Sequence, residues 1–372
     1  MRNSANFRKK RSDYILSILI FALVLFGLIA IYSVSKYYSL QLTDGDSDKY
    51  WLGRQVLFVS LGLVVWAIFQ AIDYRVWGKY SKYMLYFTIG LLLLPVFFGV
   101  TEGNTAQRWI GVGFARFQPA EMAKITLIIY LANWFSQQKD EKQVNKQTFP
   151  FFALIGAISL IMLVQKDLGT LAVMLGISAM MFYMSGASYV SLGMGAGLGA
   201  FLLYIAIKFE PYRLARLTAF LNPNADLMGS GYHIRNALIA IGSGGWWGLG
   251  FGQSRQKYLY LPEAHTDSIF AIIAEELGFL RSSLLILVFA YIASRGYRIA
   301  KYAPDKFSSL LAIGITTWFF WQAFINIGAM LSILPLTGVP LPFVSYGGSS
   351  LLFLLAATGI LINISKQANY EK

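Results

Sequence analysis

The chain of 372 residues contains no cysteine and only two histidines, His233 and His265. Disulfide bonds are therefore excluded, and a structural zinc ion would need at least two carboxylates among its ligands. Charge is also scarce. Charged residues make up 13% of the chain, whereas a typical soluble protein carries roughly 25%. Because hydrophobic residues reach 56%, the composition excludes an ordinary water-soluble globule.

Long apolar runs are abundant instead. A helix that crosses a bilayer needs roughly 20 mainly apolar residues, and the run from Tyr14 to Tyr32 contains no charged residue. Such runs predict an all-α polytopic membrane protein with about ten transmembrane helices. The expected spans are 14–32, 56–72, 83–100, 119–135, 149–164, 169–184, 190–207, 268–293, 310–333 and 349–364.

The 31 Lys and Arg residues are unevenly distributed over the loops between these spans, with the excess on the side of the N-terminus. Because cytoplasmic loops carry the positive excess, both termini are predicted to be cytoplasmic. The expected organisation is a basic N-terminal segment at 1–13, one membrane domain at 14–366 and a cytoplasmic tail at 367–372. The net charge of +13 then reflects this topology and attraction to anionic membrane lipid, and nucleic acid is not an expected partner.

The segment 208–267, between the seventh and eighth spans, is the longest predicted loop. Loops longer than about 15 residues are usually functional or disordered, and the aromatic residues Trp246, Trp247, Tyr258 and Tyr260 argue against disorder. We expect an ordered extracytoplasmic cap. Within it, "LIAIGSGGWWGLGFGQS" is typical of an amphipathic or re-entrant element at the membrane surface.

Ionisable residues inside spans are costly, so each needs a reason. Glu121 and Lys124 are three residues apart and lie on one face of the fourth span, where they can pair. The pair either joins helices or forms the polar wall of a substrate cavity, as the nearby Arg108 and Trp109 suggest. Arg281, in the eighth span, requires an interhelical partner such as a glutamate or a polar cavity.

Acidic groups gather at the start of the eighth span. Glu263, His265 and Asp267 precede it, and Glu275 and Glu276 lie two turns inside it. A single carboxylate there would be explained as a helix cap. Several acid/base groups together, with Lys and Arg nearby, also suit a reaction of a sugar pyrophosphate.

A proline-rich segment, "LPLTGVPLPFVSYGGSSLL", separates the ninth and tenth spans. Pro335, Pro340 and Pro342 forbid a regular helix, and Gly347 and Gly348 permit close approach of the backbone. The segment is predicted to be a rigid re-entrant turn. It serves either as a compact connector or as a wall of the same outer cavity.

These motifs together resemble the SEDS family (shape, elongation, division and sporulation) of membrane-embedded peptidoglycan glycosyltransferases. The resemblance covers nearly the whole chain. It is carried by "RWI" at 108–110, "QPAEMAK" at 118–124, "GSGGWWGLGFGQSRQKYLYLPEAHTD" at 242–267, "AEELG" at 274–278 and "PLPFVSYGGSS" at 340–350. Within the family, "GQSRQK" followed by "LPEAHTD" is most similar to the division branch, FtsW.

The resemblance implies a reaction and a catalytic residue. Lipid II would be polymerised into glycan strands with release of undecaprenyl pyrophosphate, and Asp267 would accept the proton of the attacking hydroxyl. Arg108, Lys124, Arg213 and Lys257 would face the pyrophosphate, and Gln118, Glu121 and His265 would complete the substrate site. The resemblance implies no definite cofactor, and a divalent cation bound to the pyrophosphate is compatible with it. A lipid II flippase is the alternative function.

The resemblance also implies a setting and partners. The protein would lie in the bacterial cytoplasmic membrane, at the division septum, with a class B penicillin-binding protein and other division proteins. For the transpeptidase, the sequence suggests docking on the ninth span, where "TTWFFWQAFINIGAML" combines aromatic residues with the small Gly328 and Ala329.

Overall fold

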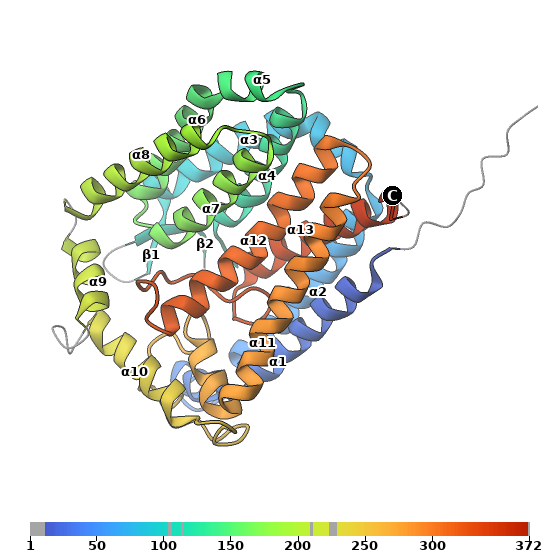
Figure 1. The fold of residues 1–372 in the computed structure, drawn as a ribbon. Coiled ribbons are helices and arrows are strands. Elements are labelled where there is room, and N and C mark those ends of the chain that lie inside the picture. The colour runs from blue at the N-terminus through green and yellow to red at the C-terminus, as the bar shows by residue number, and fades with distance from the viewer. Residues whose placement is uncertain (1–11, 103–105, 113–114, 209–210, 223–228, 371–372) are drawn as a thin grey trace, which may run out of the picture.

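The computed structural model describes residues 12–102, 106–112, 115–208, 211–222 and 229–370. Residues 1–11 of the predicted basic segment, parts of the predicted 208–267 loop and the last two residues of the predicted tail lie outside the described residues. The described chain is a helical bundle with one small sheet (Figure 1). Its helices are α1 (Tyr14–Leu42), α2 (Tyr50–Ala71), α3 (Tyr74–Phe98), α4 (Pro119–Ser136), α5 (Glu141–Lys146), α6 (Thr148–Val164), α7 (Leu168–Met184), α8 (Tyr189–Lys208), α9 (Pro211–Leu221), α10 (Ser230–Ser243), α11 (Ile269–Lys301), α12 (Lys306–Met330) and α13 (Gly348–Gln367).

Each of the ten predicted spans falls on one of these helices. Six helices of the described chain, α1, α2, α3, α11, α12 and α13, are long and apolar enough to cross a membrane, and α6, α7 and the first part of α8 are apolar but shorter. The remaining span, 119–135, matches α4, which is less apolar because it carries Glu121 and Lys124. The polytopic, helical fold is therefore confirmed, although α1 and α11 extend well beyond their predicted C-terminal ends.

Aspartates lie directly before the first residue of four apolar helices. The side chains of Asp13, Asp73, Asp167 and Asp305 accept hydrogen bonds from backbone N–H groups in the first turns of α1, α3, α7 and α12. The first N–H groups of a helix have no partner within it, so each of these side chains satisfies a donor that the helix itself leaves unpaired.

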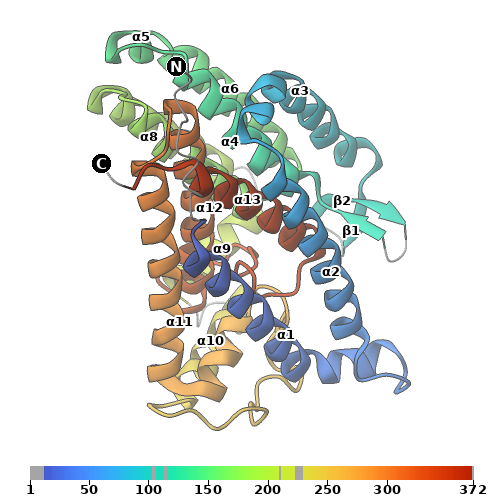
Figure 2. The same cartoon turned by 90° about the vertical axis from the view of Figure 1, so that its right-hand side faces the viewer.

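A small antiparallel sheet was not predicted from the sequence. Strands β1 (Val100–Glu102), β2 (Ala106–Val112) and β3 (Ala115–Phe117) pair in the order β1-β2-β3, beside the end of α3 (Figure 2). Strands of three to seven residues are too short for a clear alternating pattern. The sheet matters for the site because β2 carries Arg108.

The two ends of the described chain meet at one end of the bundle. Arg295 of α11 forms an ion pair with Asp13 (Nη2 to Oδ2, 2.8 Å), and the Asp13 N–H donates to Ser365 Oγ of α13 (3.1 Å). In both views α10 and the segment before α11 lie at the opposite end (Figures 1 and 2). The chain ends therefore share one side, and the predicted cap occupies the other.

The described part of the cap is folded against α11. Backbone N–H groups of Leu249 and Gly250 donate to the carbonyl oxygens of Glu275 and Glu276, both at 3.0 Å, and Phe279 N–H donates to Gly245 O (2.8 Å). Gly278 interrupts α11 with a φ of 78° and lets this stretch approach. The predicted surface element, 238–254, thus consists of the last turns of α10 and a docked loop, residues 244–254.

Two expectations on helix contacts have different outcomes. The expected interhelical partner of Arg281 is wrong: among the described residues, its Nη1 donates to the carbonyl of Trp247 in the docked loop (3.3 Å). On α12, Gly328 packs on Leu334, and Ala329 is buried. The small residues of the ninth span therefore pack inside the bundle, whereas its aromatic residues Phe320 and Phe324 are exposed, and docking of a transpeptidase on this span stays a prediction.

Candidate functional site

Asp267 lies at the end of the cap, directly before α11. Its backbone carbonyl accepts a hydrogen bond from Asn326 Nδ2 of α12 (2.7 Å), and Thr266 Oγ1 donates to its carboxylate (3.4 Å). Burial, followed by the negative charge of Glu263, raises the pKa of Asp267 to about 7, against the smaller opposing effects of Arg216 and Thr266. A carboxylate with a pKa near neutral is suited to accept a proton at physiological pH.

A stretch without regular secondary structure, residues 336–340, runs beside Asp267, and we call it the 336–340 strap. Three of its carbonyl oxygens accept side-chain hydrogen bonds: Leu336 O from Arg216 (3.0 Å), Val339 O from Asn326 (2.7 Å) and Pro340 O from Gln322 (2.9 Å).

Gly338 of the strap faces the Asp267 carboxylate. The φ of Gly338 is 68°, and a Cβ there would lie 3.6 Å from Asp267 Oδ2. For residues 336–340 of the proline-rich segment, the structure therefore favours the second predicted role, a wall of the site.

The buried pair of α4 joins the same region. Lys124 Nζ lies 2.8 Å from Glu121 Oε1 and 3.0 Å from Gln322 Oε1, and it sits over the Trp318 ring at 4.9 Å from the ring centre. Both members of the pair are almost fully buried. The predicted pair is confirmed, and Gln322 links it to the strap at Pro340.

Arg108 and Gln118 converge on an aspartate that the sequence analysis did not single out. Arg108 Nη1 lies 3.5 Å from Asp167 Oδ1, and Gln118 Nε2 donates to Asp167 Oδ2 (3.1 Å). Asp167 is 1% exposed, whereas the Arg108 side chain remains 26% exposed. The available signal was a lone acidic residue just ahead of the 169–184 span, which in isolation indicates only a helix cap.

The α7 N-terminus also contacts the strap. A Cβ on Gly169 would lie 2.3 Å from the Thr337 carbonyl oxygen. Arg108, Gln118 and Asp167, which we call the Arg108 cluster, and Asp267 are thus adjacent to neighbouring residues of the strap, Thr337 and Gly338. This proximity of residues distant in the chain is what makes the region a candidate active site.

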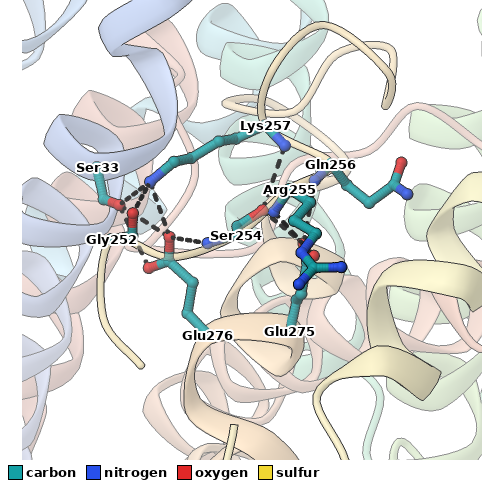
Figure 3. A network of polar contacts seen from close by, with 8 residues as sticks. All are labelled: Ser33, Gly252, Ser254, Arg255, Gln256, Lys257, Glu275 and Glu276. Carbon is teal, nitrogen blue, oxygen red and sulfur yellow. Dashed lines mark hydrogen bonds and ion pairs between the residues drawn. The ribbon is translucent and has the colours of Figure 1, made fainter. Parts of the chain in front are cut away.

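Lys257 does not belong to the accessible part of the site. Its Nζ lies 3.2 Å from Glu276 Oε1 and donates to Gly252 O (2.6 Å) and Ser33 Oγ (3.4 Å), and the residue is buried (Figure 3). The prediction that Lys257 binds pyrophosphate is therefore wrong. The Lys257 amine pairs with Glu276 of α11 and donates to Ser33 of α1, and these contacts hold the 252–257 loop to both helices.

Glu275 has the same structural role (Figure 3). Its carboxylate accepts hydrogen bonds from Ser254 Oγ and from the backbone N–H groups of Arg255 (2.9 Å) and Gln256 (3.4 Å). Both glutamates of α11 thus bind the 252–257 loop and do not join Asp267 in one acid/base cluster.

Ser254 and Lys257 have the Ser-x-x-Lys spacing of a serine nucleophile motif, but Ser254 is fully buried and the Lys257 amine faces Glu276.

His265 is enclosed by aromatic rings. Its ring centre lies 4.7 Å from that of Trp51, 5.2 Å from that of Tyr38 and 5.6 Å from that of Tyr346. Burial lowers the pKa of His265 to about 4, so the ring is neutral near pH 7. Its predicted role as a substrate-binding group is therefore corrected to packing of the cap.

Arg213 of α9 is buried, and its Nη2 donates to the Leu163 carbonyl at the end of α6 (2.7 Å). This contact ties α9 to the bundle on the side of the Arg108 cluster, because α7 follows α6 directly.

As for a divalent cation, the described residues contain no group of three His, Asp or Glu side chains that could hold a metal ion.

Comparisons with known proteins give a consistent result. The family model for FtsW, RodA and SpoVE, described as "Cell cycle protein", matches residues 14–370. The chain is 39% identical to "Stage V sporulation protein E" of Bacillus subtilis (strain 168), over 98% of this chain and 99% of that protein. It is 37% identical to "Probable peptidoglycan glycosyltransferase FtsW" of Escherichia coli O157:H7, over 95% of this chain and 86% of that protein.

Solved structures share the fold. The rod shape determining protein RodA of Thermus thermophilus superposes with a TM-score of 0.70 at 25% identity, covering 97% of this chain and 98% of that one. A chain from work described as "Structural coordination of polymerization and crosslinking by a peptidoglycan synthase complex" gives a TM-score of 0.78 at 24% identity, covering 97% of this chain and 99% of that one.

Proposed function

The chain belongs to the FtsW/RodA/SpoVE family of cell cycle proteins, and from that membership we propose that it is a peptidoglycan glycosyltransferase. It polymerises lipid II into glycan strands and releases undecaprenyl pyrophosphate. The setting that we propose is septal wall synthesis in dividing cells, at the cytoplasmic membrane, because relatives named FtsW match nearly the whole chain. The cap then faces the outside, and both termini are cytoplasmic.

The observation that carries the mechanism is the position of Asp267. As the sugar hydroxyl oxygen attacks the anomeric carbon, its proton passes to the Asp267 carboxylate, and the bond from that carbon to the pyrophosphate oxygen breaks. A carboxylate placed in this way contributes about 10²–10⁴ to the rate. With a pKa raised to about 7, Asp267 is present as the base in about half of the molecules at neutral pH.

The pyrophosphate leaving group requires positive charge. Of the four cations that the sequence suggested, Arg108 is best placed, because its side chain is 26% exposed and is held by Asp167. Lys124 and Lys257 are buried and paired with Glu121 and Glu276. We therefore assign the leaving-group contact to Arg108, and Lys124 supports the wall of the site through Gln322.

A transpeptidase is the partner that the proposed activity requires, since glycan strands must be cross-linked. The structural similarity to a chain of a peptidoglycan synthase complex supports this partner, which we propose to be a class B penicillin-binding protein. Its docking surface must differ from the small residues of α12, which are buried.

The test is polymerisation of purified lipid II by purified protein. Asp267→Asn is expected to lower the rate at least about 100-fold, the lower limit for loss of a general base. Asp46→Asn, which changes an exposed aspartate between α1 and α2, is the matched control and should retain the wild-type rate. Glycan polymer formed at the wild-type rate by Asp267→Asn would refute the mechanism.

A further inference from the structure

Asn326 connects the two segments that enclose the Asp267 carboxylate. It is 1% exposed on α12, and its Nδ2 donates to Asp267 O and to Val339 O, both at 2.7 Å. A side-chain amide has two N–H donors, and both are used here, on segments 72 residues apart in the chain. Neither carbonyl belongs to a helix or strand, so the side chain supplies a link that secondary structure does not.

Gln322, one helical turn earlier, repeats the arrangement. Its Nε2 donates to Pro340 O (2.9 Å), while its Oε1 accepts from Lys124 Nζ (3.0 Å) and from Trp318 Nε1 (2.7 Å). Residues four apart lie on one face of a helix. Two amides on α12 therefore hold two successive carbonyl groups of the 336–340 strap and fix its register along the helix.

This register decides what faces the carboxylate. Gly338, which precedes the two held residues, lies opposite Asp267 Oδ2 and has a φ of 68° that side chains rarely adopt. A shift of the strap by one residue would bring the side chain of Thr337 or Val339 to this place. The space beside Asp267 therefore depends on the contacts from α12.

We propose that Asn326 is a positioning residue for glycosyl transfer, which holds the Asp267 peptide and the strap at the separation that leaves the carboxylate free to meet the substrate hydroxyl. The inference rests on the proposed function. Asn326 is uncharged, and the charged groups that face Asp267 are Glu263 of the cap and Arg216 of α9. Loss of Asn326 should thus change the geometry of proton transfer and leave substrate affinity nearly intact.

The experiment compares Asn326→Leu, which has a similar volume and no donor, with the control Ser345→Ala. Ser345 Oγ accepts from the Leu341 N–H just beyond the strap (2.8 Å), and within the described part of the chain it makes no hydrogen bond to Asp267. In lipid II polymerisation, Asn326→Leu is expected to lower kcat about 10- to 100-fold, the effect of a misplacement near 1 Å, with KM changed less than about twofold. Ser345→Ala should keep kcat within about threefold of the wild type.

Two results would overturn the proposal. One is a folded Asn326→Leu protein with the wild-type kcat. The other is a Ser345→Ala protein that loses as much kcat as Asn326→Leu while the two variants have the same melting temperature. If Asn326→Leu does not fold, Asn326→Ser, which keeps one donor, should give a smaller loss of kcat that does not follow its melting temperature. A loss that tracks stability alone would count against positioning.

A second measurement is independent of polymerisation. Dicyclohexylcarbodiimide reacts with protonated carboxyl groups in apolar surroundings, so the pH midpoint of Asp267 labelling, read by mass spectrometry, reports its environment. We expect a lower midpoint in Asn326→Leu than in the wild type, because a released carboxyl gains contact with water. An unchanged midpoint refutes the positioning role. If the wild-type protein makes no polymer, the proposed function fails, and the labelling result still decides the role of Asn326.

Discussion

The buried Glu121–Lys124 pair gives the sharpest prediction for stability. After Lys124→Met, the Glu121 carboxylate loses its ion-pair partner while 2% exposed, and its Oε2 already has no hydrogen-bond partner among the described residues. Removal of one partner from a buried pair costs roughly 3–5 kcal/mol. After Glu121→Gln, Lys124 keeps Gln322 and the face of Trp318, so this variant should be the less destabilised of the two.

The assay is a double-mutant cycle, with unfolding in mixed micelles followed by tryptophan fluorescence. The double variant Glu121→Gln/Lys124→Met should lose less than the sum of the single losses, by about 1–3 kcal/mol, because it leaves no uncompensated buried charge. Asp73→Asn is the matched control. It removes the exposed Arg75–Asp73 pair, with side chains 60% and 45% exposed, and should cost at most about 1 kcal/mol. Additive losses, or a Lys124→Met loss as small as that of the control, would refute the reasoning.

Three further predictions follow from the cap and its ends. Asp267→Asn should raise stability at pH 8 but not at pH 4 in thermal unfolding, because the folded pKa of about 7 lies above the ordinary 3.8 and ionisation therefore costs folding energy as the pH rises between them. Equal stability changes at both pH values would contradict the raised pKa. Gly278→Ala should destabilise the protein more than Gly45→Ala. Both glycines have a positive φ, which costs an alanine about 1–2 kcal/mol. Of the two, only Gly278 has backbone atoms that a Cβ would meet, at 2.2 Å. A cysteine at the exposed Gln253 should react with an impermeant thiol reagent in intact cells and one at Asn369 should not, and the opposite pattern would reverse the proposed topology.

The predictions that succeeded depend on properties of neighbouring residues. Hydropathy over about 20 residues locates a membrane helix regardless of what it packs on, which is why each predicted span matched a helix. Glu121 and Lys124 were paired correctly because three-residue spacing on a helix fixes their proximity. The meeting of both ends of the described chain at one end of the bundle agrees with the predicted even number of spans.

The site itself was decided by contacts between distant segments. Lys257 has the charge for a pyrophosphate ligand, but the fold places it against Glu276 and Ser33. Asp167 and Asn326 carry no local signal beyond a cap and a polar residue in a span. Their roles arise because α7, α12 and the 336–340 strap meet beside Asp267. A sequence determines which groups must leave water, but only the packing of the helices determines which partners those buried groups find.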